Sequence, residues 1–184
     1  APASPSPAAP PEPKPAPPGM KPAGESGTCV TETASRKPSD WATARLAPDR
    51  AWTTSRGVGQ VVALIDSGVD ATREQFGGRV LFGVNVVTGE ARGDTDCTGT
   101  GTAMAGLIAA EAAETDPFAG VAPEAVIMPI RLVKDGATVD PATQARGIEV
   151  ALSARPTVIA LGSYVDITAD PVARMVQTVL DQGI

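Results

Sequence analysis

An aspartate, Asp66, stands at the end of an apolar run, Val61 to Ile65, and opens the turn sequence Asp-Ser-Gly. A short apolar run that ends in turn residues predicts a buried strand of a parallel sheet. Functional groups in such sheets gather at the carboxyl ends of strands, so Asp66 is a candidate catalytic or binding carboxylate. The plainer interpretation, that Asp66 only caps a turn or the next helix, stays open at this point.

A second chemical motif, Gly-Thr-Gly-Thr at residues 99–102, opens an alanine-rich stretch that continues to Ala113 and predicts a helix. Together with Gly106, its glycines invite comparison with a dinucleotide-binding fingerprint. That comparison fails, because Met104 stands where the third glycine belongs and the motif follows a polar loop rather than a strand. We therefore expect no cofactor, and a helix whose small residues pack close against a sheet.

Other side chains near these motifs offer weaker alternatives. Asp94 and Asp96 lie in a polar loop, but two loop carboxylates without further ligands are usually solvated, so we expect no metal site. Ser67 is not favoured as a nucleophile, because no base lies near it in the sequence and it lacks a nucleophile-elbow motif. The chain contains no histidine, which excludes histidine metal ligands, general bases and pH switches within it.

Charge and composition narrow the function classes. The chain has 184 residues, a formal net charge of −6 and an isoelectric point near 4.6, which disfavours a nucleic-acid partner. No apolar run approaches about 18 residues, so we expect no membrane segment in this chain. No positively charged start followed by an apolar stretch is seen, so we expect no signal peptide in this chain and interpret the start at Ala1 as a possible mature end of an exported protein. Cys29 and Cys97 are either free thiols or, in an exported chain, a pair.

The composition also divides the chain into three parts. Residues 1–27 hold most of the prolines without branched or aromatic neighbours, which predicts a disordered, extended arm or linker. The Pro-x-x-Pro spacings of this arm would also suit a ligand of an aromatic groove, but a spacer is the plainer interpretation. Globular composition begins near residue 28, and Trp41 and Trp52 are expected to pack residues 28–56 onto the domain at 57–184.

The remaining apolar patterns alternate between strands and helices. Further strands are expected at 79–87, 125–133 and 157–161, and helices at 140–154 and 170–182. The order strand, strand, helix, strand, helix, strand, helix predicts an α/β domain with a mainly parallel sheet and helices on its faces.

The last helix carries its apolar side chains at helical spacing. The side chains expected to face inward are those of Val172, Met175, Val176, Val179 and Leu180. The sequence of residues 181–184 is typical of the end of a helix, with a glycine cap, that leads into another strand. We therefore expect the domain to be incomplete at the C-terminus.

Three motifs now stand in one order along the chain. They are Asp-Ser-Gly after a strand at 66–68, Gly-Thr-Gly-Thr at the start of a helix, and Gly-Val-Ala-Pro-Glu-Ala before a strand at 120–125. Over roughly Ala47 to Ile184, they resemble the subtilisin-like serine proteases. The resemblance implies a three-layer subtilisin-like fold and serine endopeptidase ancestry. It places Asp66 at the triad aspartate and Thr100 where the family carries its triad histidine.

Other features resemble the mycosins, the subtilisin-like proteases of type VII secretion. These features are the segment from Trp41 to Trp52, the Asp-Cys pair before the glycine motif, and the proline-rich arm. The resemblance implies that residues 28–56 wrap the domain and that Cys29 pairs with Cys97. It further implies a secreted or cell-envelope location, with a peptide or protein substrate-like segment and secretion-system components as partners.

One departure from the family changes the chemistry. A threonine hydroxyl at residue 100 cannot take a proton from a catalytic serine near neutral pH, as the triad histidine must. The family's nucleophilic serine and oxyanion-hole asparagine belong to a second half that is not among these 184 residues. We therefore predict a catalytically inactive pseudoprotease that acts as a scaffold or peptide-binding component. The alternative is a fragment of an active secreted serine protease whose serine-bearing half lies beyond residue 184.

Peptide binding does not need the triad. The family strand before the peptide cleft usually reads Val-Ile-Asn, an apolar residue and Ser, where this chain has Val-Ile-Ala-Leu-Gly at 158–162. Main-chain groups of such a strand pair with an extended peptide whatever its side chains are. We therefore expect Leu161, Gly162 and Ser163 to contact a bound peptide.

Overall fold

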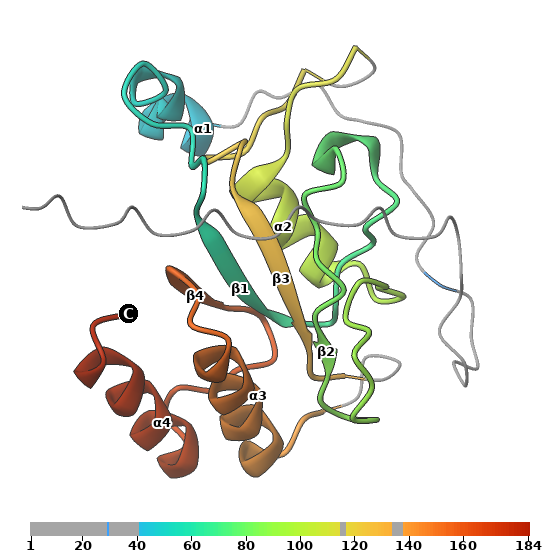
Figure 1. Cartoon of the computed structure of the whole chain (residues 1–184), viewed down its shortest axis with the longest axis vertical. Helices are drawn as coiled ribbons and strands as arrows, with labels where there is room; N and C mark the ends of the chain where they lie inside the picture. The colour runs from blue at the N-terminus through green and yellow to red at the C-terminus, as the bar shows by residue number, and fades with distance from the viewer. Residues whose placement is uncertain (1–28, 30–40, 115–116, 134–137) are drawn as a thin grey trace, which may run out of the picture.

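A computed structural model gives the structure of residues 29, 41–114, 117–133 and 138–184, except for the side chains of 41–43. The described residues form a four-stranded parallel sheet in the order β2-β3-β1-β4, with helices on both faces (Figure 1). The strands are β1 (Val61–Asp66), β2 (Val84–Asn85), β3 (Val126–Arg131) and β4 (Val158–Leu161). The helices are α1 (Trp41–Leu46), α2 (Thr100–Ala109), α3 (Pro141–Ser153) and α4 (Asp170–Asp181), and short 3-10 helices span Pro48–Arg50 and Glu74–Phe76.

β1 lies between β3 and β4, and its successive side chains point to opposite layers. Val62 and Leu64 belong to the core on the α2 side, whereas Ala63 and Ile65 belong to the core formed with α3 and α4. A parallel sheet covered on both faces needs apolar side chains at every position of its inner strands. The run from Val61 to Ile65 meets that need, and the predicted α/β fold with a mainly parallel sheet between two helical layers is confirmed.

None of the helices in the described part of the chain is both long enough and apolar enough to span a membrane.

The helix α2 lies very close to the end of β1 because the residues of α2 that face the sheet are small. A Cβ atom on Gly101 would lie only 1.9 Å from the carbonyl oxygen of Gly68. Further along the same helix, Ala105 and Ala109 are fully buried. Glycine at 101 is therefore required by the close approach of the two backbones, and the alanines extend that close contact along the sheet.

The helix α3 begins with a carboxylate cap. Asp140 accepts hydrogen bonds from the N–H groups of Ala142 and Thr143 and from the Thr143 hydroxyl. These bonds, led by that from the Thr143 hydroxyl, hold the pKa of Asp140 below its ordinary value. Pro141 occupies the first helical position, where a missing N–H has no consequence.

The strand predicted at 79–87 is wrong in its length, because only Val84 and Asn85 form β2. Val80 makes a single isolated bridge to Ile127 before the chain leaves the sheet. Gly83, with φ +60°, breaks the extended conformation, and a Cβ there would lie 1.9 Å from the carbonyl oxygen of Pro129. Pro129 has no N–H to donate to a neighbouring strand, which favours the interruption at this point.

The helix predicted at 99–113 ends earlier than expected, at Ala109. The segment that follows turns back and donates its N–H groups to the carbonyl oxygens of the last helical turn. The bonds run from Gly120 to Ala110, from Val121 to Leu107 and from Ala122 to Ile108. These donors replace the next helical turn, so the alanines after 110 do not continue the helix.

The inward face of α4 is confirmed at four of the five residues expected there. Val172 and Val179 are buried, and Met175 and Val176 are half-buried against the same core. Leu180 was expected to face inward and does not, since its side chain is 59% exposed. It lies at the rim of a shallow apolar groove between α4 and β4.

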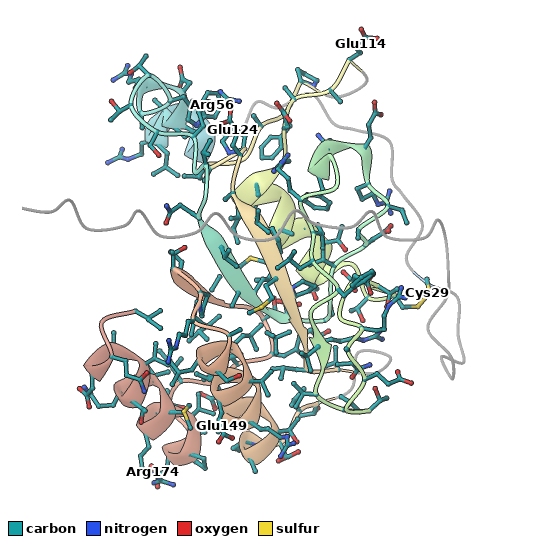
Figure 2. The ribbon with its side chains drawn as sticks, viewed as in Figure 1. Cys29, Arg56, Glu114, Glu124, Glu149 and Arg174 are labelled. Carbon is teal, nitrogen blue, oxygen red and sulfur yellow. A yellow bond between two sulfur atoms is a disulfide. The ribbon has the colours of Figure 1, made fainter. Side chains whose placement is uncertain are left out.

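Residues 47–56 are attached to the loop before β3. The Trp52 indole N–H donates to the carbonyl oxygen of Val121 at 3.0 Å, and the Arg56 guanidinium lies 5.0 Å from the centre of the Trp52 ring. Arg56 also forms an ion pair with Glu124 (Figure 2). The packing expected of Trp52 is thus observed, while the Trp41 side chain and the arm at 1–27 lie outside the described residues.

Two glycines of α2 provide a matched test of this packing. We expect Gly101→Ala to lower the free energy of unfolding by about 1–3 kcal/mol, because its Cβ would overlap the Gly68 carbonyl oxygen. Gly106→Ala meets no atom within 4 Å and should be neutral or stabilising, by up to ~1 kcal/mol. Urea denaturation measures both variants, and equal stability of the two would contradict the close approach of α2 to β1.

Candidate functional site

Asp66 is fully buried at the carboxyl end of β1. Its Oδ1 accepts hydrogen bonds from the Ser67 N–H at 2.7 Å and from the Thr100 hydroxyl at 2.6 Å. Its Oδ2 accepts a hydrogen bond from the Ser163 N–H at 2.8 Å. These donors compensate the carboxylate for its removal from water. Asp66 thus binds groups from its own turn, from α2 and from the loop after β4.

Thr100 reaches Asp66 because it is the first residue of α2. The chain enters the helix through Gly99, whose backbone is left-handed with φ 89°. The Thr100 hydroxyl donates to Asp66, and its oxygen also lies 2.9 Å from the Ser67 Oγ. The structure therefore brings together Asp66 and Thr100, which the sequence separates by 34 positions.

A second carboxylate, that of Asp96, continues the network on the other side of Ser67. The Ser67 Oγ donates to Asp96 Oδ1 at 2.9 Å and accepts from the Gly101 N–H at 2.9 Å. Asp96 also accepts hydrogen bonds from the first turn of α2 and the residues before it, namely from the N–H groups of Thr98, Gly99 and Thr102 and from the Thr102 hydroxyl. Asp96 therefore holds the N-terminus of α2 and Ser67 in fixed positions.

Sequence reasoning missed this role, because it treated Asp96 as a solvated loop carboxylate. The signal was present: an aspartate shortly before a helix is typical of residues that accept hydrogen bonds from the helical N-terminus. The contact with Ser67 was beyond reach, since 29 positions separate the two residues in the sequence.

The loop after β4 completes the surroundings of Asp66. The Gly162 N–H donates to the Ile65 carbonyl oxygen at 2.9 Å, and the next N–H, that of Ser163, reaches Asp66. A Cβ on Gly162 would lie 1.9 Å from Asp66 Oδ2, so only glycine fits there. Leu161 lies beside Ile65 in the β1–β4 pairing. The structure thus places Leu161, Gly162 and Ser163 next to Asp66.

A disulfide joins Cys29 to Cys97, the pair that the mycosin resemblance implied (Figure 2). Cys97 directly follows Asp96 in the chain. The bond therefore attaches Cys29 to the loop that positions α2. It links residues 68 positions apart, and closing a loop of such length stabilises a fold by roughly 4 kcal/mol on the chain-entropy account.

The expectation that Asp94 is a solvated carboxylate is wrong. Asp94 is only 3% exposed, and its Oδ1 accepts a hydrogen bond from Arg92 Nε at 2.7 Å. The Arg92 guanidinium also lies over the Phe82 ring. In the described part of the chain, no group of three or more cysteine, aspartate or glutamate side chains is arranged to hold a metal ion.

The hydroxyl protons around Asp66 are already engaged. The Thr100 proton points to Asp66, and the Ser67 proton points to Asp96. Both oxygens of Asp96 also accept hydrogen bonds from the first turn of α2 and the residues before it, so this carboxylate is already engaged in holding the helix. Ser67 is also only 1% exposed and is out of reach of a substrate. Among the described residues, the arrangement suits a structural network better than proton transfer.

The contribution of the Thr100 hydroxyl to this network is measurable. We expect Thr100→Val to lower the free energy of unfolding by about 1–3 kcal/mol, because the buried Asp66 carboxylate loses a donor. Thr100→Ser keeps the hydroxyl and is the matched control, with a smaller loss. Chemical denaturation of both variants checks this. Equal stability of Thr100→Val and wild type would show that Asp66 does not depend on the Thr100 hydrogen bond.

The sequence profile of the subtilase family matches residues 57–178, which is more than half of the chain. Mycosin-4 of Mycobacterium tuberculosis is 44% identical over 84 residues, which cover 45% of this chain and 18% of mycosin-4. Thermitase of Thermoactinomyces vulgaris is 28% identical over 117 residues, which cover 64% of this chain and 42% of thermitase.

Solved structures agree with the sequence relatives. MycP1, a serine protease described as an essential component of the type VII (ESX-1) secretion system, aligns with a TM-score of 0.65 and 27% identity over 84% of this chain and 48% of its own. A periplasmic assembly from the ESX-5 inner membrane complex aligns with a TM-score of 0.58 and 28% identity over 74% of this chain and 42% of its own. The chain spans less than half the length of each of these four relatives. With its resemblance to mycosins confirmed, the chain belongs to the subtilase family.

Proposed function

We propose that this protein is a catalytically inactive subtilase that binds peptide segments as a scaffold component. The observation that carries the proposal is the Thr100 hydroxyl bound to Asp66 Oδ1 at 2.6 Å, in a chain without histidine. In this proposal Asp66 holds the position of the triad aspartate, and Thr100 holds that of the triad histidine.

Inactivity follows from the chemistry of the family. Serine proteases need an imidazole that accepts the serine proton and returns it to the leaving amine. Loss of the histidine alone lowers turnover roughly a million-fold, which corresponds to about 8 kcal/mol in the barrier. Both oxygens of Asp66 already accept donors from the described residues. This supports a structural role for Asp66, which has no imidazole to orient.

The proposed peptide site is the edge of β4 and the residues that continue from it, Leu161 to Ser163. β4 is the edge strand of the described sheet, and an edge strand offers main-chain groups to an extended peptide. The N–H groups of Gly162 and Ser163 are engaged with Ile65 and Asp66, so their proposed peptide contacts use the carbonyl oxygens.

The partners and location are proposed from the relatives. MycP1 is described as an essential component of the type VII (ESX-1) secretion system, and the second structure is a periplasmic assembly from the ESX-5 inner membrane complex. We therefore infer that this protein acts at the cell envelope or as a secreted protein, in contact with secretion-system components. Its acidic net charge of −6 favours basic partners over acidic ones.

The competing function is that of an active secreted serine protease whose nucleophile lies beyond residue 184. The observation that favours this function is that the chain spans only part of the length of its relatives: its alignment covers 48% of the MycP1 chain. Even in that case Thr100 argues against ordinary triad catalysis, because its hydroxyl cannot accept and return the serine proton as an imidazole does.

Turnover and binding, measured on the full-length protein, distinguish these functions. We expect fluorescein-labelled extended L-peptides to bind, as measured by anisotropy, without cleavage above the uncatalysed rate. A D-peptide of the same sequence is the matched control, since strand pairing depends on backbone handedness, and it should bind more weakly. Peptide turnover that Asp66→Ala abolishes would overturn the inactive assignment, and absence of any L-peptide binding would overturn the peptide-binding role.

Thr100→His provides a second test on the same full-length protein. A scaffold that also lacks the catalytic serine gains no turnover from this change. Turnover that appears with Thr100→His and disappears with Asp66→Ala would instead show that a serine half is present and that the threonine alone blocks catalysis.

A further inference from the structure

The disulfide between Cys29 and Cys97 lies at the outer edge of the described structure (Figure 2). Both of its residues are partly exposed, and Cys97 begins the short stretch 97–99 that leads into α2. Thiol–disulfide exchange requires that an attacking thiolate can approach one of the two sulfur atoms. Partial exposure of both cysteines favours that approach in the folded protein.

The loop ahead of the disulfide is anchored to the rest of the fold by hydrogen bonds of its own. The Gly93 N–H donates to the Phe82 carbonyl oxygen, and the Gly93 carbonyl oxygen accepts from the Val69 N–H. The Arg131 guanidinium donates to the Thr95 hydroxyl at 3.2 Å. Reduction of the disulfide leaves these bonds in place, so we expect this part of the loop to keep its position.

Residues 97–99 have fewer anchors. The N–H groups of Thr98 and Gly99 donate to Asp96 Oδ1, and the Gly99 carbonyl oxygen accepts from the Ala103 N–H within α2. In the part of the chain that the structure describes, the hydrogen bonds of this stretch thus stay within the loop and α2. The disulfide is what links the stretch to a residue 68 positions earlier in the chain.

The Asp96 carboxylate connects this weakly anchored stretch to the Asp66 network. Its Oδ1 accepts the Ser67 hydroxyl at 2.9 Å as well as the two N–H groups of the stretch. The stretch runs directly into Thr100, whose hydroxyl donates to Asp66 at 2.6 Å. A displacement of the stretch therefore moves the N-terminus of α2 and one of the donors that compensate the buried Asp66 carboxylate.

We propose that the bond between Cys29 and Cys97 is a redox-sensitive switch, which a dithiol reductant opens in the folded protein and which thereby loosens the start of α2. A thiolate of the reductant attacks one sulfur of the bond, the S–S bond breaks and a mixed disulfide forms. The second thiolate of the reductant then displaces the protein sulfur. Two electrons and two protons pass to the protein, so both cysteines become thiols and the reductant becomes a cyclic disulfide.

The first part of the test asks whether exchange occurs without unfolding. The oxidised full-length protein is incubated with dithiothreitol in the absence of denaturant, and the free thiols are trapped with iodoacetamide. We expect peptide mapping by mass spectrometry to show both cysteines alkylated within hours, while circular dichroism shows that the fold is retained. A disulfide that stays closed until denaturant is added would overturn the proposal.

The second part measures amide hydrogen exchange in the oxidised and the reduced protein. The N–H groups of Thr98, Gly99 and Thr102, all bound by Asp96, should exchange about tenfold faster after reduction, because they open locally. The amides of α3, which lies on the other face of the sheet, should change less than about twofold. Unchanged exchange at the three groups, or equal acceleration throughout α2 and α3, overturns the proposal, because the second result means only a loss of global stability.

Cys29→Ser is the matched variant, since it removes the link and leaves the α2 loop itself unaltered. It should show the fast exchange without reductant and should not respond to dithiothreitol. Addition of oxidised dithiol to the reduced wild-type protein should restore slow exchange. These readouts require neither peptide binding nor turnover, so the switch is tested independently of the proposed function.

Discussion

The described structure depends on one buried carboxylate. Asp66 has no exposed surface, and a charge in that position is tolerated only when hydrogen-bond donors surround it. Its donors come from the turn after β1, from the start of α2 and from the loop after β4. The carboxylate therefore fixes three segments relative to one another. The close approaches that this requires explain the glycines at 101 and 162, where a Cβ would overlap a neighbouring oxygen.

The same hydrogen bonds account for the proposed loss of catalysis. In subtilisin-like chemistry the aspartate orients an imidazole, which moves the proton. In this chain the Thr100 hydroxyl, a shorter donor, binds Asp66 directly, and Ser67 links the pair to Asp96 at the N-terminus of α2. Removal of Asp66 would leave three donors without their acceptor, among them the buried N–H of Ser67. The hydrogen bonds therefore give the Asp66 carboxylate a structural role that does not need a histidine.

Much of this arrangement was predictable from local sequence. The apolar run before Asp66, the alanine-rich helix and the alternation of strands and helices predicted the sheet and its layers correctly. The failures arose where distant segments decide local structure. β2 is short because Gly83 meets Pro129, and α2 stops at Ala109 because residues 120–122 bond its carbonyl groups. The role of Asp96 depends partly on a contact with Ser67 that sequence spacing does not reveal.

The central claim is that Asp66 supports structure and activates no nucleophile. Labelling of the full-length protein with a fluorophosphonate probe tests it most directly, because this reagent modifies serines whose hydroxyl a catalytic base has activated. The account predicts no labelled serine, both in the wild-type protein and after Asp66→Ala. A serine that is labelled in the wild type and unlabelled in Asp66→Ala would contradict it.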